Sequence, residues 1–333
     1  MPENRTPEKK ARRRAISPIQ FTILLYGSLI AILLLAYYPY DSDKQTVKAH
    51  VDRPATGFYQ NVYAQTAGFS PEEATKDDAY AAGAKAWDEA NHPEEDLKQF
   101  AAQYHLEDKR VLEVGSGAGY LQDIVRDYTG LDISPSAGRH YHKPFVAASA
   151  TDMPFPDGTF DAIWTINVLE HIPNPESALV EMRRVLKPGG VMYLSPAWQA
   201  PSWAAQGYEV RPYSDFSLTG KISKATVPMR KSMTFQALYI LPLRYVRYAQ
   251  TRVSSTPSAF RYRKLTPNYE HYWVPDADAV NSMDPYEAVL WFKTRGDRCL
   301  NCTDGVKGIA GTPGKLVIQV KPGGAVAVAE SVR

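Results

Sequence analysis

The sequence has few cysteines and little net charge, and each absence excludes a class of protein. Its 333 residues include two cysteines, too few for a disulfide framework or, by themselves, for a tetrahedral zinc site. The formal net charge is +2, so the overall charge does not mark a nucleic-acid binder, and we expect no nucleic-acid partner. Hydrophobic residues make up 44% of the chain, which suffices for a folded core and excludes a disordered chain.

Basic residues concentrate in one stretch of the chain. Between residues 200 and 265, eleven lysines and arginines are accompanied by only two acids, Glu209 and Asp215. The rest of the chain must be net acidic, because the whole chain carries a charge of only +2. A local basic block of this kind indicates a local anionic partner.

One apolar run near the start is long enough to cross a membrane. Residues 19–38 carry no charge, and a helix of this length spans about 30 Å, the thickness of a bilayer hydrocarbon core. Basic residues precede the run, so the positive-inside rule puts the N-terminus in the cytoplasm. We expect a basic cytoplasmic tail over residues 1–18 and a single-pass transmembrane helix over residues 19–38. A cleaved signal peptide is the alternative, but the run is long and no small-x-small cleavage site follows it.

Beyond this run the apolar pattern alternates between strand and helix periods. A stalk and an N-terminal helical arm are expected over residues 39–92. Short apolar segments then predict strands at residues 110–114, 130–133, 160–166 and 191–195. Helical patterns accompany them at residues 93–104, 120–128 and 175–186. Alternation of this length indicates an α/β fold, a parallel sheet with helices on both faces.

The alternation breaks over residues 197–283 and resumes at Asp284, which begins a helix with Pro285 at its first position. Residues 187–190 are predicted as a turn, and two short strands are predicted near residues 298–302 and 316–321. We therefore expect one domain over residues 93–321, with an insertion at residues 197–283 and a flexible tail over residues 322–333.

A glycine-rich loop follows the first strand of this domain. Gly115, Gly117 and Gly119 lie between a predicted strand and a predicted helix, where the backbone can approach a ligand closely. The next residue is Tyr120, which breaks the dinucleotide-binding fingerprint. Asp132 ends the following strand, where an acid can accept hydrogen bonds from both hydroxyls of a ribose. An ordinary strand-end aspartate is the alternative, but the spacing from the glycine loop favours the ribose role.

Four sequence blocks match one family in order. They are VLEVGSGAGY, TGLDIS, ATDMPFPDGTFDAIWTINVLEHI and VLKPGG, and they cover roughly residues 108–196. The chain resembles the class I S-adenosylmethionine-dependent methyltransferases of the small-molecule, type 11-like kind. The resemblance implies a Rossmann-like sheet of seven strands whose last strand is antiparallel, and S-adenosyl-L-methionine as the cofactor.

The resemblance also implies which residues bind the cofactor. The glycine loop and its strand would contact the methionine part, Asp132 the ribose, and Ile133 the adenine. The full implied set is Glu113, Gly115, Ser116, Gly117, Gly119, Asp132, Ile133, Ala150, Thr151, Asp152, Asn167 and Val168. Many relatives have an acid where this chain has Ser149, so the adenine amino group would contact Ser149 or Asp152.

The sequence contains no compact catalytic motif, and two histidines are candidates for a general base. His171 follows the strand at residues 160–166 and could act near the methyl group, or it could cap a helix or pack beside the site. His271 precedes the final helix, at a place similar to one where relatives have a histidine that reaches the substrate pocket; a surface histidine is the alternative. Asp276 and Asp278 could bind a cation, but loop acids ahead of a helix are commoner, so we expect no metal site.

Two further segments have alternative interpretations. Cys299 and Cys302 form a C-x-x-C pair that predicts incidental thiols, or a local disulfide if the domain lies outside the cytoplasm. Residues 232–252 are apolar and aromatic with three arginines, at positions 244, 247 and 252. This segment predicts a contact with the membrane interface, with its arginines at the headgroups, or a helical lid over the pocket.

Together these features predict a membrane-anchored methyltransferase acting by in-line displacement on a small-molecule, glycan or lipid-linked acceptor. The basic insertion favours an anionic or lipid-linked acceptor. The alternatives are a catalytically silent methyltransferase fold that serves as a membrane scaffold, and a nicotinamide-dependent oxidoreductase. The charge rule puts the catalytic domain across the membrane from the cytoplasm, where the cofactor is made, so the sequence leaves its side of the membrane open.

Overall fold

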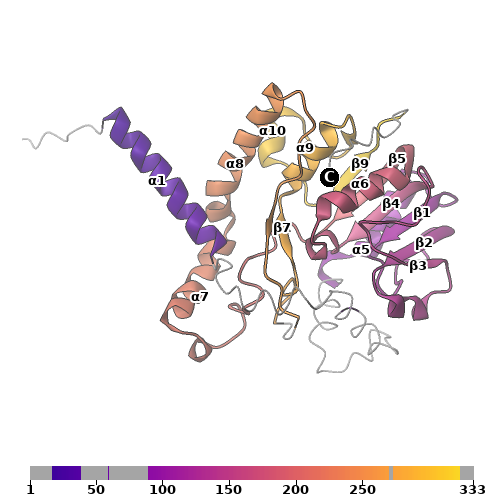
Figure 1. Ribbon diagram of the computed structural model, residues 1–333, viewed down its shortest axis with the longest axis horizontal. Helices are drawn as coiled ribbons and strands as arrows, with labels where there is room; N and C mark the ends of the chain where they lie inside the picture. The colour runs from indigo at the N-terminus through magenta and orange to yellow at the C-terminus, as the bar shows by residue number, and fades with distance from the viewer. Residues whose placement is uncertain (1–16, 39–58, 60–88, 270–272, 323–333) are drawn as a thin grey trace, which may run out of the picture.

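The computed structural model describes residues 17–38, 59, 89–269 and 273–322 (Figure 1). Most of the predicted cytoplasmic tail, most of the stalk and helical arm, His271 and nearly all of the C-terminal tail lie outside the described residues.

A seven-stranded mixed sheet forms the centre of the described structure. In spatial order its strands are β3 (Phe145–Ala147), β2 (Asp127–Asp132), β1 (Arg110–Val114), β4 (Phe160–Ile166), β5 (Leu186–Ser195), β9 (Leu316–Gln319) and β8 (Arg298–Cys299). Neighbouring strands from β3 to β5 pair in parallel, whereas β9 is antiparallel to β5. The predicted Rossmann-like sheet with an antiparallel last strand is confirmed.

Helices cover both faces of the sheet because its central strands are apolar on both sides. In β1, Val111 packs with the cluster that includes Leu97 of α5 (Pro93–Gln103). Its neighbour Leu112 packs with the opposite cluster, which includes residues of α6 (Pro175–Val185) and α9 (Pro285–Lys293). Asn174 and Asp284 cap α6 and α9 by accepting hydrogen bonds from backbone amides, so the predicted starts of both helices are confirmed.

The segment after the glycine loop is not the helix predicted at residues 120–128. It forms turns and bends, with amides bonded three residues back, as from Gln122 to the Gly119 carbonyl at 3.2 Å. Lys143 Nζ also donates to the carbonyls of Gln122 and Val125, both at 2.7 Å. A helix would need such carbonyls for its own hydrogen bonds. The helix prediction is therefore wrong here.

Strand boundaries also differ from the predictions. β2 begins at Asp127, three residues before the predicted start, and β5 begins at Leu186, so the predicted turn at residues 187–190 lies within the strand. β3 was not predicted, because its three residues are too few to show a period. Cys299 and Cys302 are joined by a disulfide, one of the two states that the sequence allowed.

The N-terminal apolar run forms one helix, α1 (Pro18–Tyr37). Ser17 and Gln20 form a capping box, in which each side chain accepts a hydrogen bond from the other's backbone amide. Among the described residues this is the one helix long and apolar enough to cross a membrane, judged by length and composition alone. A signal sequence or a soluble core helix can pass the same test, but only 6% of this apolar stretch is buried.

The insertion forms two helices and a two-stranded ribbon. α7 (Leu218–Lys231) and α8 (Met233–Val253) follow a short 3₁₀ turn at Tyr213–Asp215, and β6 (Tyr262–Lys264) pairs antiparallel with β7 (Asn281–Met283). α8 contacts α1 on one side and α9 and α10 (Gly305–Ala310) on the other. The insertion thus lies between α1 and the sheet (Figure 1).

Two of the three arginines of α8 do not face outward. Arg244 pairs with Asp284 at 2.7 Å and Arg247 with Glu287 at 2.6 Å, and each arginine side chain is 10% exposed. The expectation that these two arginines meet lipid headgroups is therefore wrong, because their guanidinium groups are engaged with acids at the start of α9. Arg252 is exposed, and its guanidinium lies 5.9 Å from the Tyr248 ring.

Candidate cofactor-binding site

A cavity of about 170 Å³ lies at the carboxyl ends of β1, β2 and β4. Ligands of open α/β sheets bind at this edge, because the loops after parallel strands meet there. Eight residues predicted to act at the site line this cavity: Gly115, Asp132, Ile133, Ala150, Thr151, Asn167, Val168 and His171. The predicted residues outside its lining are Glu113, Ser116, Gly117, Gly119 and Asp152.

The glycine loop needs glycine for conformation and for space. The backbone φ is 71° at Gly115 and 75° at Gly119, values that other residues rarely adopt. A Cβ atom at Gly115 would overlap the Val168 side chain, and one at Gly119 would lie 2.7 Å from the Tyr141 ring. The loop therefore packs closely on neighbouring side chains and presents its backbone to the cavity at Gly115.

The glycine loop also positions Asp132. One oxygen of this carboxyl accepts a hydrogen bond from the Gly117 amide and the other from the Ser134 amide, both at 2.9 Å. Burial raises the pKa of Asp132 above its ordinary value, and these backbone N–H groups oppose part of that rise because they favour the charged form. The carboxyl is therefore held in place at the end of β2, where it lines the cavity.

Glu113 does not line the cavity. It accepts a hydrogen bond from the Tyr128 hydroxyl, and burial raises the pKa of Glu113 to about 8. A carboxyl with this pKa is largely protonated at neutral pH. In this structure Glu113 therefore connects β1 to Tyr128 of the neighbouring strand β2.

The structure separates the two candidates for the adenine contact. Ser149 lines the cavity, with its hydroxyl 2.8 Å from that of Thr151, whereas Asp152 is exposed and outside the lining. Tyr59 also lines the cavity and was missed by the sequence analysis. It lies more than fifty residues before the glycine loop, and no motif at Tyr59 connects it with that loop.

His171 lies at the cavity wall among carboxyl groups. It ends a 3₁₀ turn at Leu169–His171, and its Nδ1 lies 3.5 Å from Asp278 Oδ2. Tyr59 donates a hydrogen bond to the same oxygen at 2.8 Å. Burial lowers the pKa of His171, but the carboxylates of Asp278, Glu170 and Asp276 outweigh burial, so the pKa is raised. The imidazole thus lies among carboxylates that favour its protonated form.

Three of these groups are also spaced like metal ligands. Ligand atoms of Glu170, His171 and Asp276 lie within 4.8 Å of one another. The sequence predicts no metal site here. The spacing also suits an imidazole paired with carboxylates, and His171 Nε2 lies 3.8 Å from Glu170 Oε1.

Residues 112–194 match the family model of the methyltransferase domain. The match runs from β1 to β5 and includes the glycine loop, Asp132 and His171. This part of the chain is therefore a methyltransferase domain of the kind that the resemblance to class I S-adenosylmethionine-dependent methyltransferases implies.

Curated methyltransferases are similar to part of the chain. A fatty-acid O-methyltransferase of Mycolicibacterium smegmatis is 39% identical over 119 residues, which cover 31% of this chain and 43% of that protein. A ubiquinone biosynthesis O-methyltransferase of Dechloromonas aromatica is 39% identical over 107 residues, or 27% of this chain and 45% of that protein. A probable phthiotriol/phenolphthiotriol dimycocerosates methyltransferase of Mycobacterium ulcerans is 35% identical over 121 residues, which cover 32% of this chain and 47% of that protein. The chain thus spans less than half the length of these relatives.

Solved structures of methyltransferases are also similar to part of the chain. A putative methyltransferase of Bacillus halodurans is 25% identical, and the match covers 36% of this chain and 60% of that protein, with a TM-score of 0.30. The fold itself follows from the strand order of the sheet.

The residues of the methyltransferase domain fit S-adenosylmethionine, the cofactor of this family. Asp132 offers a carboxyl for ribose hydroxyls, and Ile133 and Val168 offer apolar contacts. Ser116 adds a buried hydroxyl that has no hydrogen-bond partner in the described part of the chain. Because Gly115 lines the cavity without a side chain, a ligand can approach its backbone there.

Proposed function

We propose that this protein is a membrane-anchored methyltransferase that moves the methyl group of S-adenosylmethionine to a lipid-linked or anionic amphiphilic acceptor. The observation that carries the proposal is the cavity at the ends of β1, β2 and β4, which unites Gly115, Asp132 and His171 within the matched domain. This combination supports cofactor binding and a nearby proton acceptor at one site.

The cavity residues perform three tasks in this mechanism. When bound, S-adenosylmethionine supplies an electrophilic sulfonium methyl group. The glycine loop and Asp132 orient it, and the apolar side chains of Ile133 and Val168 exclude water from the reacting atoms. If the acceptor is a hydroxyl, His171 would take its proton during transfer of the methyl group that the cofactor would supply. Asp278, 3.5 Å from Nδ1, then stabilises the imidazolium.

Two observations support the anchor and the class of acceptor. The apolar side chains of α1 are exposed over most of its length, as a helix in contact with lipid would require, and the basic insertion contacts this helix through α8. Two relatives are named for acting on fatty acids and on phthiotriol or phenolphthiotriol dimycocerosates, which supports an amphiphilic acceptor.

Calorimetry on the full chain in detergent tests the enzyme proposal. S-adenosylhomocysteine should bind, and NAD should not. Binding of NAD alone would favour an oxidoreductase, and binding of neither ligand would favour the scaffold alternative. Binding of S-adenosylhomocysteine without methyl transfer to lipid or glycan extracts would also favour a scaffold.

The orientation of the anchor needs a separate measurement. The charge rule puts the N-terminus in the cytoplasm and the methyltransferase domain on the other side. Protease protection of a C-terminal tag in sealed, inside-out vesicles should then leave the tag intact. Digestion of the tag would show the opposite orientation, with the domain on the side where its cofactor is made.

A further inference from the structure

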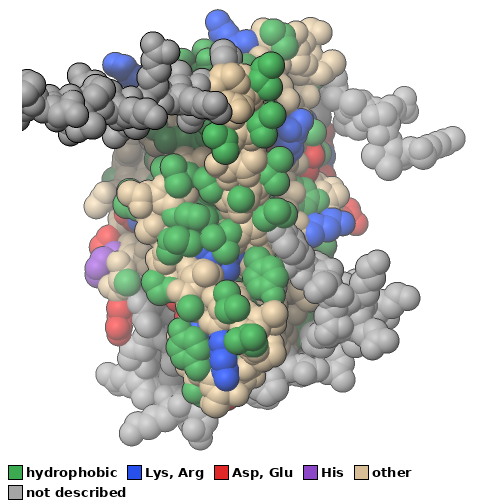
Figure 2. Space-filling model, turned by 90° about the vertical axis from the view of Figure 1, so that its left-hand side faces the viewer, with side chains coloured by type: hydrophobic (Ala, Val, Ile, Leu, Met, Phe, Trp, Pro, Cys, Tyr) green, Lys and Arg blue, Asp and Glu red, His purple; other side chains and the backbone are tan. Residues whose placement is uncertain are grey.

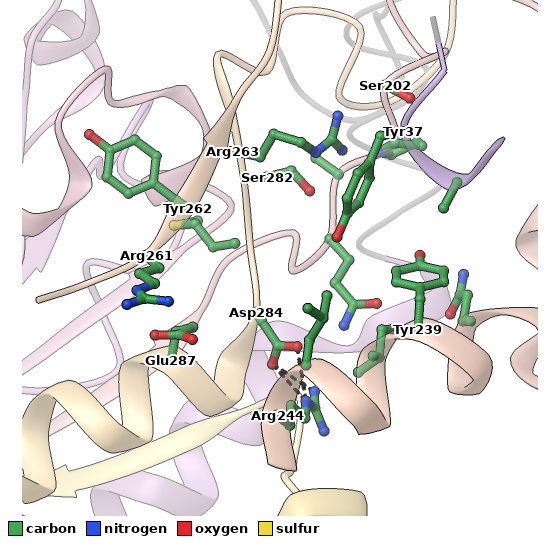
Figure 3. A pocket seen from close by; sticks show the side chains of 18 of the residues that line it. Tyr37, Ser202, Tyr239, Arg244, Arg261, Tyr262, Arg263, Ser282, Asp284 and Glu287 are labelled. Atoms are coloured by element: carbon green, nitrogen blue, oxygen red, sulfur yellow. Dashed lines mark hydrogen bonds and ion pairs between the residues drawn. The ribbon is translucent and has the colours of Figure 1, made fainter. Parts of the chain in front are cut away.

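A second and larger cavity lies at the C-terminal end of α1. It has a volume of about 460 Å³ and is enclosed by α1, α8, the loop at residues 199–203 and the β6–β7 ribbon (Figure 3). No described residue lines both this cavity, which we call the anchor cavity, and the cofactor cavity. The two adjoin where the Tyr262 hydroxyl donates to the Pro173 carbonyl at 3.4 Å. The anchor cavity is therefore a separate site that shares a wall with the cofactor site.

The end of α1 is fixed to the insertion. Arg230 donates to the Ala36 carbonyl at 3.1 Å, and the Ser202 hydroxyl donates to the Tyr38 carbonyl at 3.0 Å. The Tyr37 ring lies edge-on to Tyr239 of α8, with centroids 5.7 Å apart. The last carbonyls of a helix have no partner within it, so these contacts complete the helix end. If α1 spans a bilayer, the anchor cavity must therefore lie where the helix leaves the membrane.

The surface around the anchor cavity is apolar. On α7 and α8 the large hydrophobic side chains that are at least half exposed include Leu218, Met233, Leu238, Tyr245, Val246 and Val253. Figure 2, which views the molecule from the side of α1 and α8, shows hydrophobic side chains gathered down this face. Exposed apolar patches of this kind mark contacts with membranes or partners. Continuity with the exposed side chains of α1 favours the membrane.

The inside of the anchor cavity is positively charged. Five basic and three acidic side chains line it. The three acids are all engaged in ion pairs, which are Lys231–Glu209, Arg244–Asp284 and Arg247–Glu287. The other two basic side chains are Arg261 and Arg263, on or beside β6, and the Arg263 guanidinium lies 4.6 Å from the centre of the Tyr37 ring. Among the described residues, the side chains that line the cavity therefore sum to a net positive charge, beside an apolar wall that includes Ile240 and Leu243.

We propose that the anchor cavity binds the phosphate headgroup of an anionic lipid of the bilayer that α1 spans. Guanidinium groups bind phosphate oxygens through paired, charge-assisted hydrogen bonds. The apolar wall and the surrounding surface would contact the acyl chains. The inference rests on the proposed membrane anchoring, but it does not require that the bound lipid be the methyl acceptor.

Native mass spectrometry of the full chain in detergent tests this proposal, with dioctanoyl phosphatidate as the probe. We expect one bound phosphatidate per chain, and binding at least tenfold weaker for dioctanoylglycerol, which lacks the phosphate. The double substitution Arg261→Gln and Arg263→Gln should weaken phosphatidate binding by about thirtyfold, since each basic group near a headgroup contributes about fivefold in affinity. The single substitution Arg261→Glu, at an exposed position where the fold is least at risk, should weaken binding by at least tenfold.

Lys264→Gln provides the matched control. Lys264 is exposed on the same strand, has the same charge and lies outside the cavity lining, so its substitution should change phosphatidate binding by less than about twofold. An equal loss in this control would show that charge on the surface acts without the cavity, and would overturn the proposal. Phosphatidate binding that is unchanged in both arginine variants would overturn it too.

Two further measurements distinguish a lipid phosphate from free phosphate, and the lipid site from the proposed enzyme function. Inorganic phosphate that binds as tightly as phosphatidate would identify a free anion as the ligand and overturn the lipid assignment. S-adenosylhomocysteine affinity is measured on the same samples, as a sign that the methyltransferase domain is folded. If the wild-type chain binds phosphatidate but not S-adenosylhomocysteine, the proposed enzyme function fails and the lipid site stands.

Discussion

The two cavities of this protein are built in different ways. The cofactor cavity lies at the ends of parallel strands, and its charged group, Asp132, is oriented by backbone amides within one matched domain. The anchor cavity is assembled from segments far apart in the chain, from α1 to α9, and its charges belong mainly to long side chains. A sheet edge thus provides a site through its backbone, whereas an insertion provides one through packing.

The largest expected effect concerns the packing of the insertion. Arg247→Met leaves the buried Glu287 carboxyl without its partner, which costs about 3–5 kcal/mol. We expect the melting temperature in detergent to fall by on the order of 10 °C. Arg252→Met is the control on the same helix, and its exposed side chain should shift the midpoint by only about 1–2 °C. Equal, small shifts would mean that α8 is a loosely held lid.

The next effect concerns the backbone-built site. Asp132→Ala removes a carboxyl that can accept hydrogen bonds from the ribose, so S-adenosylhomocysteine affinity should fall by about 30- to 1,000-fold. Calorimetry measures this change. Asp127→Ala is the matched control at the other end of β2, where the side chain is 52% exposed, and it should leave the affinity within about twofold. An unchanged affinity in Asp132→Ala would refute the assignment of this site.

A smaller effect concerns the proton acceptor. Asp278 raises the pKa of His171, and Asp278→Asn should lower that pKa. A base acts in its neutral form, so activity is lost as the pH falls through its pKa. In the wild type this loss should be centred above pH 6.5, the ordinary value for histidine, and in the variant it should move to lower pH. An acid limb that stays in place would show that His171 is not the base.

The smallest effect concerns Tyr59, which lines the cofactor cavity from outside the matched domain. Tyr59→Phe removes the hydrogen bond to Asp278 and should raise the KM for S-adenosylmethionine by about three- to tenfold. Ser149→Ala gives a comparison within the matched domain, because Ser149 lines the same cavity. No change for Tyr59→Phe would confine the site to the matched domain.

The sequence predicted what depends on local patterns. β1 and β4 were placed to the residue, and Asp132 was found from its spacing after the glycine loop. The turn after that loop could not be predicted, because its carbonyls accept hydrogen bonds from Lys143, which lies in a later segment.

Long-range pairing escaped the sequence analysis in the same way. The partners of Arg244 and Arg247 lie forty residues further on, so nothing local distinguished a buried arginine from one at a membrane surface. Tyr59 reaches the cofactor cavity from outside the matched domain, where no motif marks it. His271, the second candidate base, lies outside the described residues and stays a prediction.

The contacts at the end of α1 have a consequence for how the protein would encounter its substrate. Because Arg230 and Ser202 hold the last carbonyls of that helix, the rest of the molecule cannot swing freely about it. In a bilayer, the mouth of the cofactor cavity would then stay at a fixed height and tilt. An acceptor dissolved in the same leaflet would arrive by lateral diffusion in two dimensions, and one dissolved in water would have to find a surface-bound target.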